Sequence, residues 1–200
     1  WLVTSISLRT ASGKCGTRIS NTGCSGNRMY LNRGDGTFAD ATDRTGVRDG
    51  WWGWGAAIED FGDDGRLSVM QTNGYVGEDP PRDSFITDPM RLWVPISDGD
   101  RDEGSAGEPD VSKFSDGAQR AGLDATAVGH SLIPFDMDDD GDLDVFVGNL
   151  GGPPNLYRND RPDTRHWLTV RLDDPTRPGN RDGIGARVVV TPVVGGTERA

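Results

Sequence analysis

The chain has 200 residues, of which 32 are Asp or Glu and 21 are Lys or Arg, so that its formal net charge is −11. This balance argues against a nucleic-acid partner, because contacts to phosphates need a basic face, and it favours cations as partners. No apolar run approaches the roughly 18 residues that a membrane span requires, so no membrane span is expected.

Glycine and proline interrupt the chain throughout. The 29 Gly and 12 Pro leave almost no stretch in which three helical turns could form, and only 34% of the residues are hydrophobic. Short strands joined by turns are typical of such a sequence. We therefore expect an all-β protein.

The two cysteines, Cys15 and Cys24, lie in the Gly-, Ser- and Asn-rich segment "KCGTRISNTGCSGN". A disulfide between them would restrain a surface loop and would indicate an oxidising compartment. A pair of free thiols is the alternative, whereas a zinc site would need further Cys or His ligands nearby. None is nearby, and a disulfide is the favoured prediction.

An internal repeat organises most of the chain. Residues 28–90 and 91–154 each contain an aromatic strand, a Gly-Asp turn, a phenylalanine, a D-x-x-x-R-x-G sequence, an apolar strand, an acidic loop and a second apolar strand. The second copy carries an acidic insert at 97–113. Residues 1–27 match the end of a unit and 155–160 match the start of another. The sequence therefore predicts an excerpt from a longer array of repeats.

Repeats of this size with several short strands are typical of β-propeller blades, in which each unit buries one face against the next. Two complete units cannot close a ring of about four to eight blades, so we expect an incomplete ring. Residues 161–200 do not follow the repeat. Their strand-like runs "WLTVRL" (167–172) and "ARVVVTPVV" (186–194) predict a separate β-hairpin or small domain, a small β module at the C-terminal end.

The segment "DMDDDGDLD" (136–144) crowds six carboxylates into nine positions, which would repel one another without a cation between them. Oxygen ligands select a hard cation, and calcium fits better than magnesium, which prefers to keep several waters. An EF-hand would require a Glu where Val147 stands, so we expect a calcium loop within a β-hairpin; a solvated acidic turn is the alternative. The predicted ligands are the side chains of Asp136, Asp138, Asp140 and Asp144 and the backbone carbonyl of Asp142.

The equivalent loop of the first repeat, "DFGDDGRLS" (60–68), has lost half of these charged ligands. Gly62 and Ser68 stand where carboxylates are expected. A weak second metal site would use Asp60, Asp64, Ser68 and the backbone of Arg66. The side chain of Arg66 could partly neutralise this loop instead, so the sequence leaves open whether the loop holds a metal.

Two other features have a functional and a structural interpretation. The "RGD" at 33–35 could be an integrin ligand, but it lies in the repeat's own turn "NRGDGTF", where Gly-Asp-Gly is a turn requirement. Trp51, Trp52 and Trp54 could form a platform on which sugars stack. Their alternation with Gly favours core packing, with at least one of them between repeat units.

The sequence shows no motif of a known catalytic centre. It contains no G-x-S-x-G, no H-E-x-x-H and no phosphate-cradling glycine loop, and its only histidines are His130 and His166. His130 occupies the position of Trp54 in the other repeat, which indicates a strand residue rather than a base. A non-enzymatic binding module is therefore favoured. The alternatives are a calcium-dependent propeller hydrolase or lyase, and a self-associating subunit of a surface layer or filament.

The stretches "NRGDGTFADAT", "GWGAAIEDFGDDGRL" and "DMDDDGDLDVFVGNLGGPPNLYRN" together resemble the FG-GAP or VCBS repeats of integrin-like β-propellers. The later stretch "HWLTVRL…GNRDGIGARVVV" resembles the ASPIC and UnbV domain that follows such repeats in the cartilage acidic protein family, here in truncated form. The resemblance implies a secreted or cell-surface propeller with calcium in its loops. It further implies adhesion through a protein or glycan ligand of the cell surface or matrix. The boundary between the two parts is expected between Arg161 and Arg165.

Overall fold

The computed structural model describes residues 2–5, 26–75, 86–96, 101–102, 111–161, 167–191, 193–194 and 197–198. The predicted disulfide between Cys15 and Cys24 and most of the acidic insert lie outside the described residues. The chain divides into two compact units, Trp1–Arg165 and His166–Ala200, and each is described by itself.

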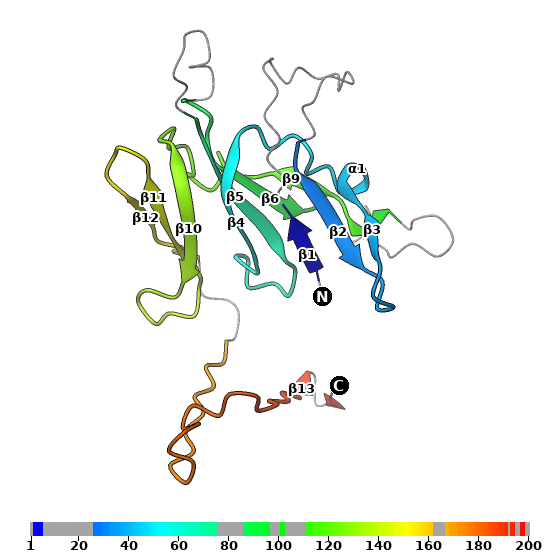
Figure 1. Cartoon of the computed structure of the whole chain (residues 1–200), viewed down its shortest axis with the longest axis vertical. Helices are drawn as coiled ribbons and strands as arrows, with labels where there is room; N and C mark the ends of the chain where they lie inside the picture. The colour runs from blue at the N-terminus through cyan, green and yellow to red at the C-terminus, as the bar shows by residue number, and fades with distance from the viewer. Residues whose placement is uncertain are drawn as a thin grey trace. The chain divides into compact units, whose positions relative to one another are not determined.

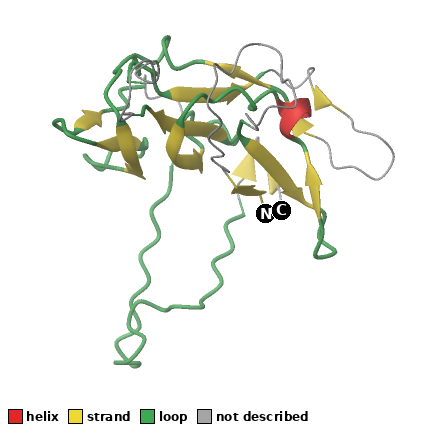
Figure 2. Cartoon of the chain, turned by 45° about the horizontal axis from the view of Figure 1, so that its top comes forward, coloured by secondary structure: helices red, strands yellow, loops and turns green. Residues whose placement is uncertain are grey.

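The prediction of an all-β protein is confirmed. Strands and loops make up nearly all of the described chain, and the short α1 (Thr42–Thr45) is the helix found there (Figure 2). Neighbouring strands pair antiparallel in separate sheets, none of which closes on itself. The first unit contains β1 (Leu2–Ser5), β2 (Arg28–Asn32), β3 (Phe38–Asp40), β4 (Gly53–Glu59), β5 (Ser68–Asn73), β6 (Arg91–Pro95), β7 (Arg101–Asp102), β8 (Val111–Ser112), β9 (Phe114–Asp116), β10 (Gly129–Phe135), β11 (Asp144–Asn149) and β12 (Asn155–Tyr157).

Three sheets follow one another in chain order across the first unit (Figure 1). Strands β1, β2 and β3 form the first sheet, β4, β5, β6 and β9 the second, and β10, β11 and β12 the third; β7 and β8 form a separate small pair. The sheets are out of phase with the sequence repeat. Residues 28–90 contribute β2 and β3 to the first sheet but β4 and β5 to the second. Each sequence unit therefore spans two consecutive sheets.

The second and third sheets approach each other closely at two glycines. A Cβ atom on Gly55 of β4 would lie 2.9 Å from the backbone nitrogen of Leu132. One on Gly129 of β10 would lie 2.8 Å from the Cβ of Thr72. Only a residue without a side chain fits at these points. Both sheets contribute to one apolar core, made of Phe61, Met70, Met90, Leu92, Ala118, Leu123, Val145 and Val147.

A buried polar network lies between the first and second sheets. The amide of Asn27 donates to Gln71 Oε1 at 2.7 Å, and Gln71 Nε2 donates to Asn73 Oδ1 at 2.5 Å and to the Gly50 carbonyl at 2.8 Å. The three side chains are almost fully buried. Because buried polar groups are costly when unpaired, these mutual hydrogen bonds allow polar residues to occupy the interior.

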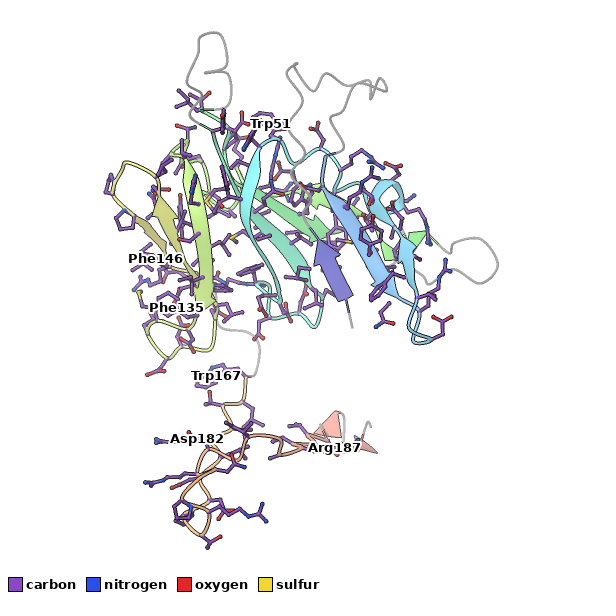
Figure 3. The ribbon with its side chains drawn as sticks, in the orientation of Figure 1. Trp51, Phe135, Phe146, Trp167, Asp182 and Arg187 are labelled. Carbon is purple, nitrogen blue, oxygen red and sulfur yellow. The ribbon has the colours of Figure 1, made fainter. Side chains whose placement is uncertain are left out.

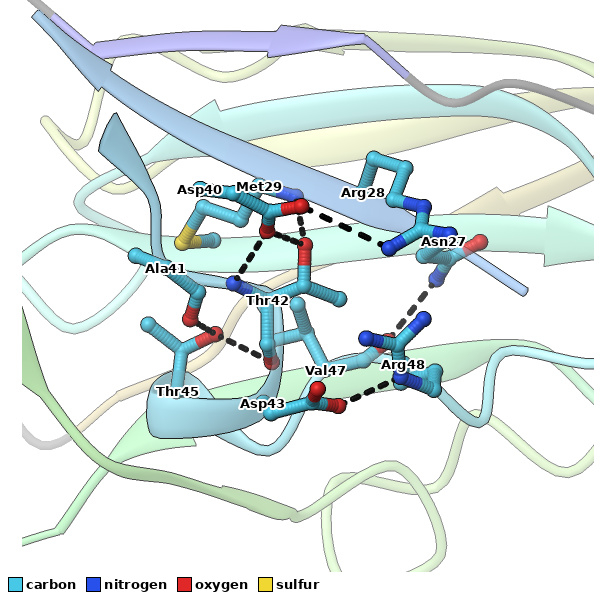
Figure 4. A network of polar contacts seen from close by, with 10 residues as sticks. All are labelled: Asn27, Arg28, Met29, Asp40, Ala41, Thr42, Asp43, Thr45, Val47 and Arg48. Atoms are coloured by element: carbon cyan, nitrogen blue, oxygen red, sulfur yellow. Dashed lines mark hydrogen bonds and ion pairs between the residues drawn. The ribbon is translucent and has the colours of Figure 1, made fainter. Parts of the chain in front are cut away.

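The D-x-x-x-R-x-G sequence of the first repeat begins with an aspartate that organises the turn into α1 (Figure 4). The carboxylate of Asp40 accepts hydrogen bonds from the Thr42 backbone N–H at 3.0 Å and from the Thr42 hydroxyl at 2.5 Å. Arg28 Nη1 lies 3.4 Å from the same carboxylate. The Met29 N–H in turn donates to Thr42 Oγ1 at 2.9 Å, so the turn is attached to β2.

The second repeat uses the same arrangement, with Ala118 in place of Thr42 and therefore without its hydroxyl. Asp116 accepts a hydrogen bond from the Ala118 backbone N–H at 3.0 Å and forms an ion pair with Arg91. Arg91 stands at the start of β6, as Arg28 stands at the start of β2. In each repeat, the Asp that begins the signature and the Arg that begins the preceding strand therefore join two neighbouring strands of one sheet.

The tryptophan cluster is only partly in the core. Trp51 is 44% exposed, and the guanidinium of Arg91 lies 4.4 Å from the centre of its ring, so the expectation of core packing is wrong for Trp51. Trp54 stacks on His130 of the third sheet, with 4.1 Å between ring centres, as expected for a residue between repeat units. Trp52 stacks on Tyr75.

The segment "RGD" forms part of the turn between β2 and β3. The Arg33 N–H donates to the Thr37 carbonyl at 3.0 Å, and Gly34 and Gly36 have φ values of 84° and 87°. These left-handed conformations favour glycine, which gives the structural reason for the motif.

The second unit is a separate compact unit, as the sequence predicts, but among its described residues the runs 167–172 and 186–194 do not pair as a hairpin. Residues 167–191 form loops and turns, and the strands described in this unit are β13 (Val193–Val194) and β14 (Thr197–Glu198), which pair with each other. Figure 3 shows Trp167, Asp182 and Arg187 on irregular chain. Leu168 and Ile184 are 67% and 84% exposed. A two-stranded hairpin is marginal by itself, and within this unit no described sheet covers the apolar side chains that would stabilise one.

Asp88 predicts a pH dependence of stability. Its side chain is 5% exposed, and its Oδ2 has no hydrogen-bond partner among the described residues. Burial raises the pKa of Asp88 from 3.8 to about 6, against the opposing effects of the Trp52 N–H and Arg91. The folded state therefore holds a proton that the unfolded state has released between these pH values, and the free energy of unfolding falls as the pH rises through that window.

Asp88→Asn removes this ionisation. At pH 7.5 the variant should exceed the wild type in free energy of unfolding by up to about 3 kcal/mol, and the difference should vanish near pH 4. Urea denaturation at the two pH values measures it. Asp49→Asn, at an exposed carboxylate, is the control and should change little. A difference that is the same at both pH values would contradict the assignment.

Candidate metal centre

The acidic loop connects β10 to β11, so strands flank it as the sequence predicts. Its backbone curls around the carboxylate of Asp136, which accepts hydrogen bonds from the N–H groups of Asp140 at 3.2 Å and Gly141 at 3.0 Å. Asp139 and Gly141 have φ values of 59° and 93°. These left-handed residues produce the sharp turn that directs successive carboxylates toward one side.

Three carboxylates of this loop converge. Asp136, Asp138 and Asp144 each offer one oxygen, and the three oxygens lie within 4.8 Å of one another. Oxygens on opposite sides of a calcium ion at about 2.3–2.6 Å are separated by roughly 5 Å. The spacing therefore fits an arrangement in which the three groups share one metal ion.

Asp144 anchors the cluster from beneath. Its side chain is 1% exposed, its Oδ2 accepts the Met137 N–H at 2.7 Å, and its Oδ1 accepts the Asn159 N–H at 2.8 Å. The first donor belongs to the loop, and the second follows β12. The Asn159 side chain continues the connection, because its Nδ2 donates to the Phe61 carbonyl at 3.1 Å. The buried carboxylate of Asp144 thus joins the acidic loop to the segment that follows β12.

The surroundings of Asp138, the outer carboxylate, disfavour its ionisation. Partial desolvation, followed by the charges of Asp140 and Asp144, raises the pKa of Asp138. Arg158, whose Nη1 lies 3.8 Å from Asp138 Oδ2, acts in the opposite direction. A bound divalent cation would add a much larger positive charge at the same place.

Asp140 and Asp142 belong to the loop but not to the group of three. The Oδ1 of Asp140 accepts the Asp142 N–H at 3.0 Å, and the Asp142 carboxylate accepts a hydrogen bond from the backbone of Arg161. Desolvation is the main cause that raises the pKa of Asp142. The roles of the Asp140 side chain and the Asp142 carbonyl as ligands stay predictions.

The first loop has the same backbone as the second. The carboxylate of Asp60 accepts the N–H groups of Asp64 at 3.0 Å and Gly65 at 2.6 Å, as that of Asp136 does in the second loop. Asp63 and Gly65 have φ values of 45° and 76°. The two loops therefore differ in their charges and not in their course.

Arginines stand beside the carboxylates of the first loop. Arg66 donates from Nε and Nη2 to Asp64 Oδ2 at 3.1 and 2.7 Å, so its guanidinium balances part of the negative charge of this loop. A Cβ on Gly62 would lie 3.0 Å from Nη1 of Arg161 and 3.6 Å from Asp60 Oδ1. Sequence analysis missed Arg161, since no local pattern relates it to this loop. The proposed weak ligands Asp60, Asp64 and Ser68 form no three-carboxylate group, because Ser68 replaces the third.

Of the two histidines, His130 lies within the described residues. The ring of His130 stacks on Trp54, and His166 lies outside the described residues. None of the helices in the described ranges is long and apolar enough to cross a membrane.

The fold and the acidic loop together define an all-β protein with a candidate cation-binding hairpin. No family model matches the chain. A comparison with curated proteins finds similarity to cartilage acidic protein 1 of Xenopus tropicalis, with 27% identity over 167 residues. The alignment covers 80% of this chain and 22% of the relative, so the chain spans about a fifth of the relative's length. The similarity agrees with the resemblance to the cartilage acidic protein family, whereas the FG-GAP repeat assignment has no matching family model.

The anchor and the outer ligand should differ in their effect on the metal-free protein. Asp144→Ala leaves the Met137 and Asn159 N–H groups without their acceptor in a buried place, and should lower the free energy of unfolding by about 3 kcal/mol. Asp138→Ala removes an exposed charge from a crowded loop and should change it by less than about 0.5 kcal/mol. Urea denaturation in EDTA measures both. Equal losses in the two variants would show that Asp144 is not the anchor.

Proposed function

We propose that this chain is an extracellular calcium-binding β-repeat module that mediates adhesion by binding a protein or glycan of the cell surface or matrix. The observation that carries the proposal is the convergence of Asp136, Asp138 and Asp144 within 4.8 Å at the end of a β-hairpin. The rest of the proposal depends on what such a loop can bind and where the chain works.

Calcium suits the donors better than other common cations do. All three converging atoms are carboxylate oxygens, which are hard ligands, and neither His nor Cys belongs to the group. Calcium accepts six to eight oxygens in irregular geometry, so Asp140, the Asp142 carbonyl and water can complete its shell. Magnesium would require a regular octahedron at shorter distances.

An extracellular role is supported by the similarity to a protein that is named for cartilage and for its acidity. The net charge of −11 agrees with a chain that meets cations at millimolar concentration. The predicted disulfide between Cys15 and Cys24 would fit the same compartment. Sheets that are packed through a common core provide a rigid support for the loops at their ends.

Calcium should raise the melting temperature through the second loop. Extracellular calcium modules have dissociation constants of about 10⁻⁴ to 10⁻³ M, so a concentration ten times higher adds about 1.4 kcal/mol, or a few degrees. Asp138→Asn should abolish most of this shift, because it removes a converging ligand without removing the anchor. Differential scanning calorimetry with calcium and with EDTA measures the effect.

Asp64→Asn is the matched control in the first loop. It should leave the calcium-induced shift unchanged, because Asp64 is paired with Arg66, although it can change the melting temperature in EDTA. Magnesium at the same concentration should give a smaller shift. A wild-type protein that melts at one temperature with and without calcium would refute the proposal, as would an Asp64 variant that loses the shift as fully as the Asp138 variant.

A further inference from the structure

A second candidate site lies in a cleft between the second and third sheets, within the first unit. Its volume is about 600 Å³, which falls within the range of roughly 300–1,000 Å³ typical of small-molecule sites. The cleft is open to solvent and is lined by residues of both sheets and of the chain that follows β12.

The floor of the cleft is apolar. Met70 and Leu92 come from the second sheet, Val145 from the third, and Leu123 from the connection between them. All four are buried members of the common core. The half-buried ring of Tyr157 also lines the cleft. Such a floor can cover the apolar face of a ring-shaped ligand.

The rim of the cleft is basic, although the chain as a whole is acidic. Four arginines line it, and two carboxylates, those of Asp64 and Asp160, accompany them. The lining therefore has an excess of two positive charges in a chain of net charge −11. The four arginines are Arg66, Arg120, Arg158 and Arg161. A local reversal of charge of this kind attracts anions.

Arg120 is the arginine best placed to meet a ligand. Arg66 is held by Asp64 and Arg158 by Asp160, and the charge of Arg161 acts on Asp142 of the acidic loop. Arg120 is exposed and takes part in no ion pair within the part of the chain that the structure describes. Its planar guanidinium can bind a carboxylate or sulfate group through two parallel hydrogen bonds.

We propose that the cleft binds an acidic sugar unit of a matrix glycan, with its anionic group at Arg120 and its ring against the apolar floor. The inference rests on the proposed function and names the ligand class for it. The anionic group can be a sulfate or the carboxylate of a uronate, because both offer oxygens to a guanidinium. A volume of about 600 Å³ accommodates about one disaccharide.

Isothermal titration calorimetry in EDTA tests the site with three disaccharides: a sulfated heparin disaccharide, an unsulfated uronate disaccharide of hyaluronan, and neutral chitobiose. The heparin disaccharide should bind and chitobiose should not. Binding of the hyaluronan disaccharide as well assigns the recognition to the carboxylate, and its failure to bind assigns it to sulfate. Arg120→Gln should weaken binding about tenfold.

Arg33→Gln is the control for net charge, since it removes an exposed arginine in the β2–β3 turn that does not line the cleft, and it should leave the affinity unchanged. Ala121→Phe places a ring in the cleft without changing the charge and should block binding. Three results would overturn the inference. They are the absence of heat with any disaccharide at 10-fold molar excess and millimolar concentration, equal binding of chitobiose, and equal losses of affinity in the Arg120 and Arg33 variants. Because these titrations contain EDTA, a failure to bind disaccharides would not affect the prediction of a calcium-induced melting shift. Likewise, the absence of a calcium-induced shift would not affect disaccharide binding in EDTA.

Discussion

The buried carboxylate of Asp144 is the interaction on which the acidic loop depends. A carboxylate that is 1% exposed is costly unless hydrogen bonds compensate for the lost water, and here two backbone N–H groups do so. One donor lies in the loop and the other follows β12, so the loop is held to its own sheet. Because the carboxylate of Asp144 is fixed, Asp136 and Asp138 converge beside a carboxylate that cannot move away. The result is a concentration of negative charge that a hard cation would stabilise.

The two acidic loops have the same backbone conformation, but their negative charges are balanced in different ways. Both wrap their N–H groups around the first aspartate, and both use left-handed residues at the same positions. Ser68 takes the place of Asp144 and Arg66 that of Asp142, so the first loop has fewer carboxylates and a guanidinium of its own. The backbone hydrogen bonds determine the course of each loop. The side chains determine whether a guanidinium or a metal ion balances its negative charge.

The sequence was informative where structure is local. Gly and Pro punctuation predicted short strands, and the spacing of aspartates placed a tight loop between two of them, as observed. The offset between the sheets and the sequence repeat could not be predicted in this way, because strand pairing joins residues distant in the chain. The approach of Arg161 to Gly62 is likewise a tertiary contact. The runs 167–172 and 186–191 have strand-like composition but lack, among the described residues, a sheet to cover them.

A crystal structure grown in calcium tests the central claim most directly. The account predicts one ion at the second loop, bound by carboxylate oxygens of Asp136, Asp138 and Asp144 at about 2.3–2.6 Å, with Arg158 displaced from Asp138. It predicts that Arg66 stays on Asp64 in the first loop. Water in place of the ion at the second loop, or an ion at the first loop alone, would contradict it.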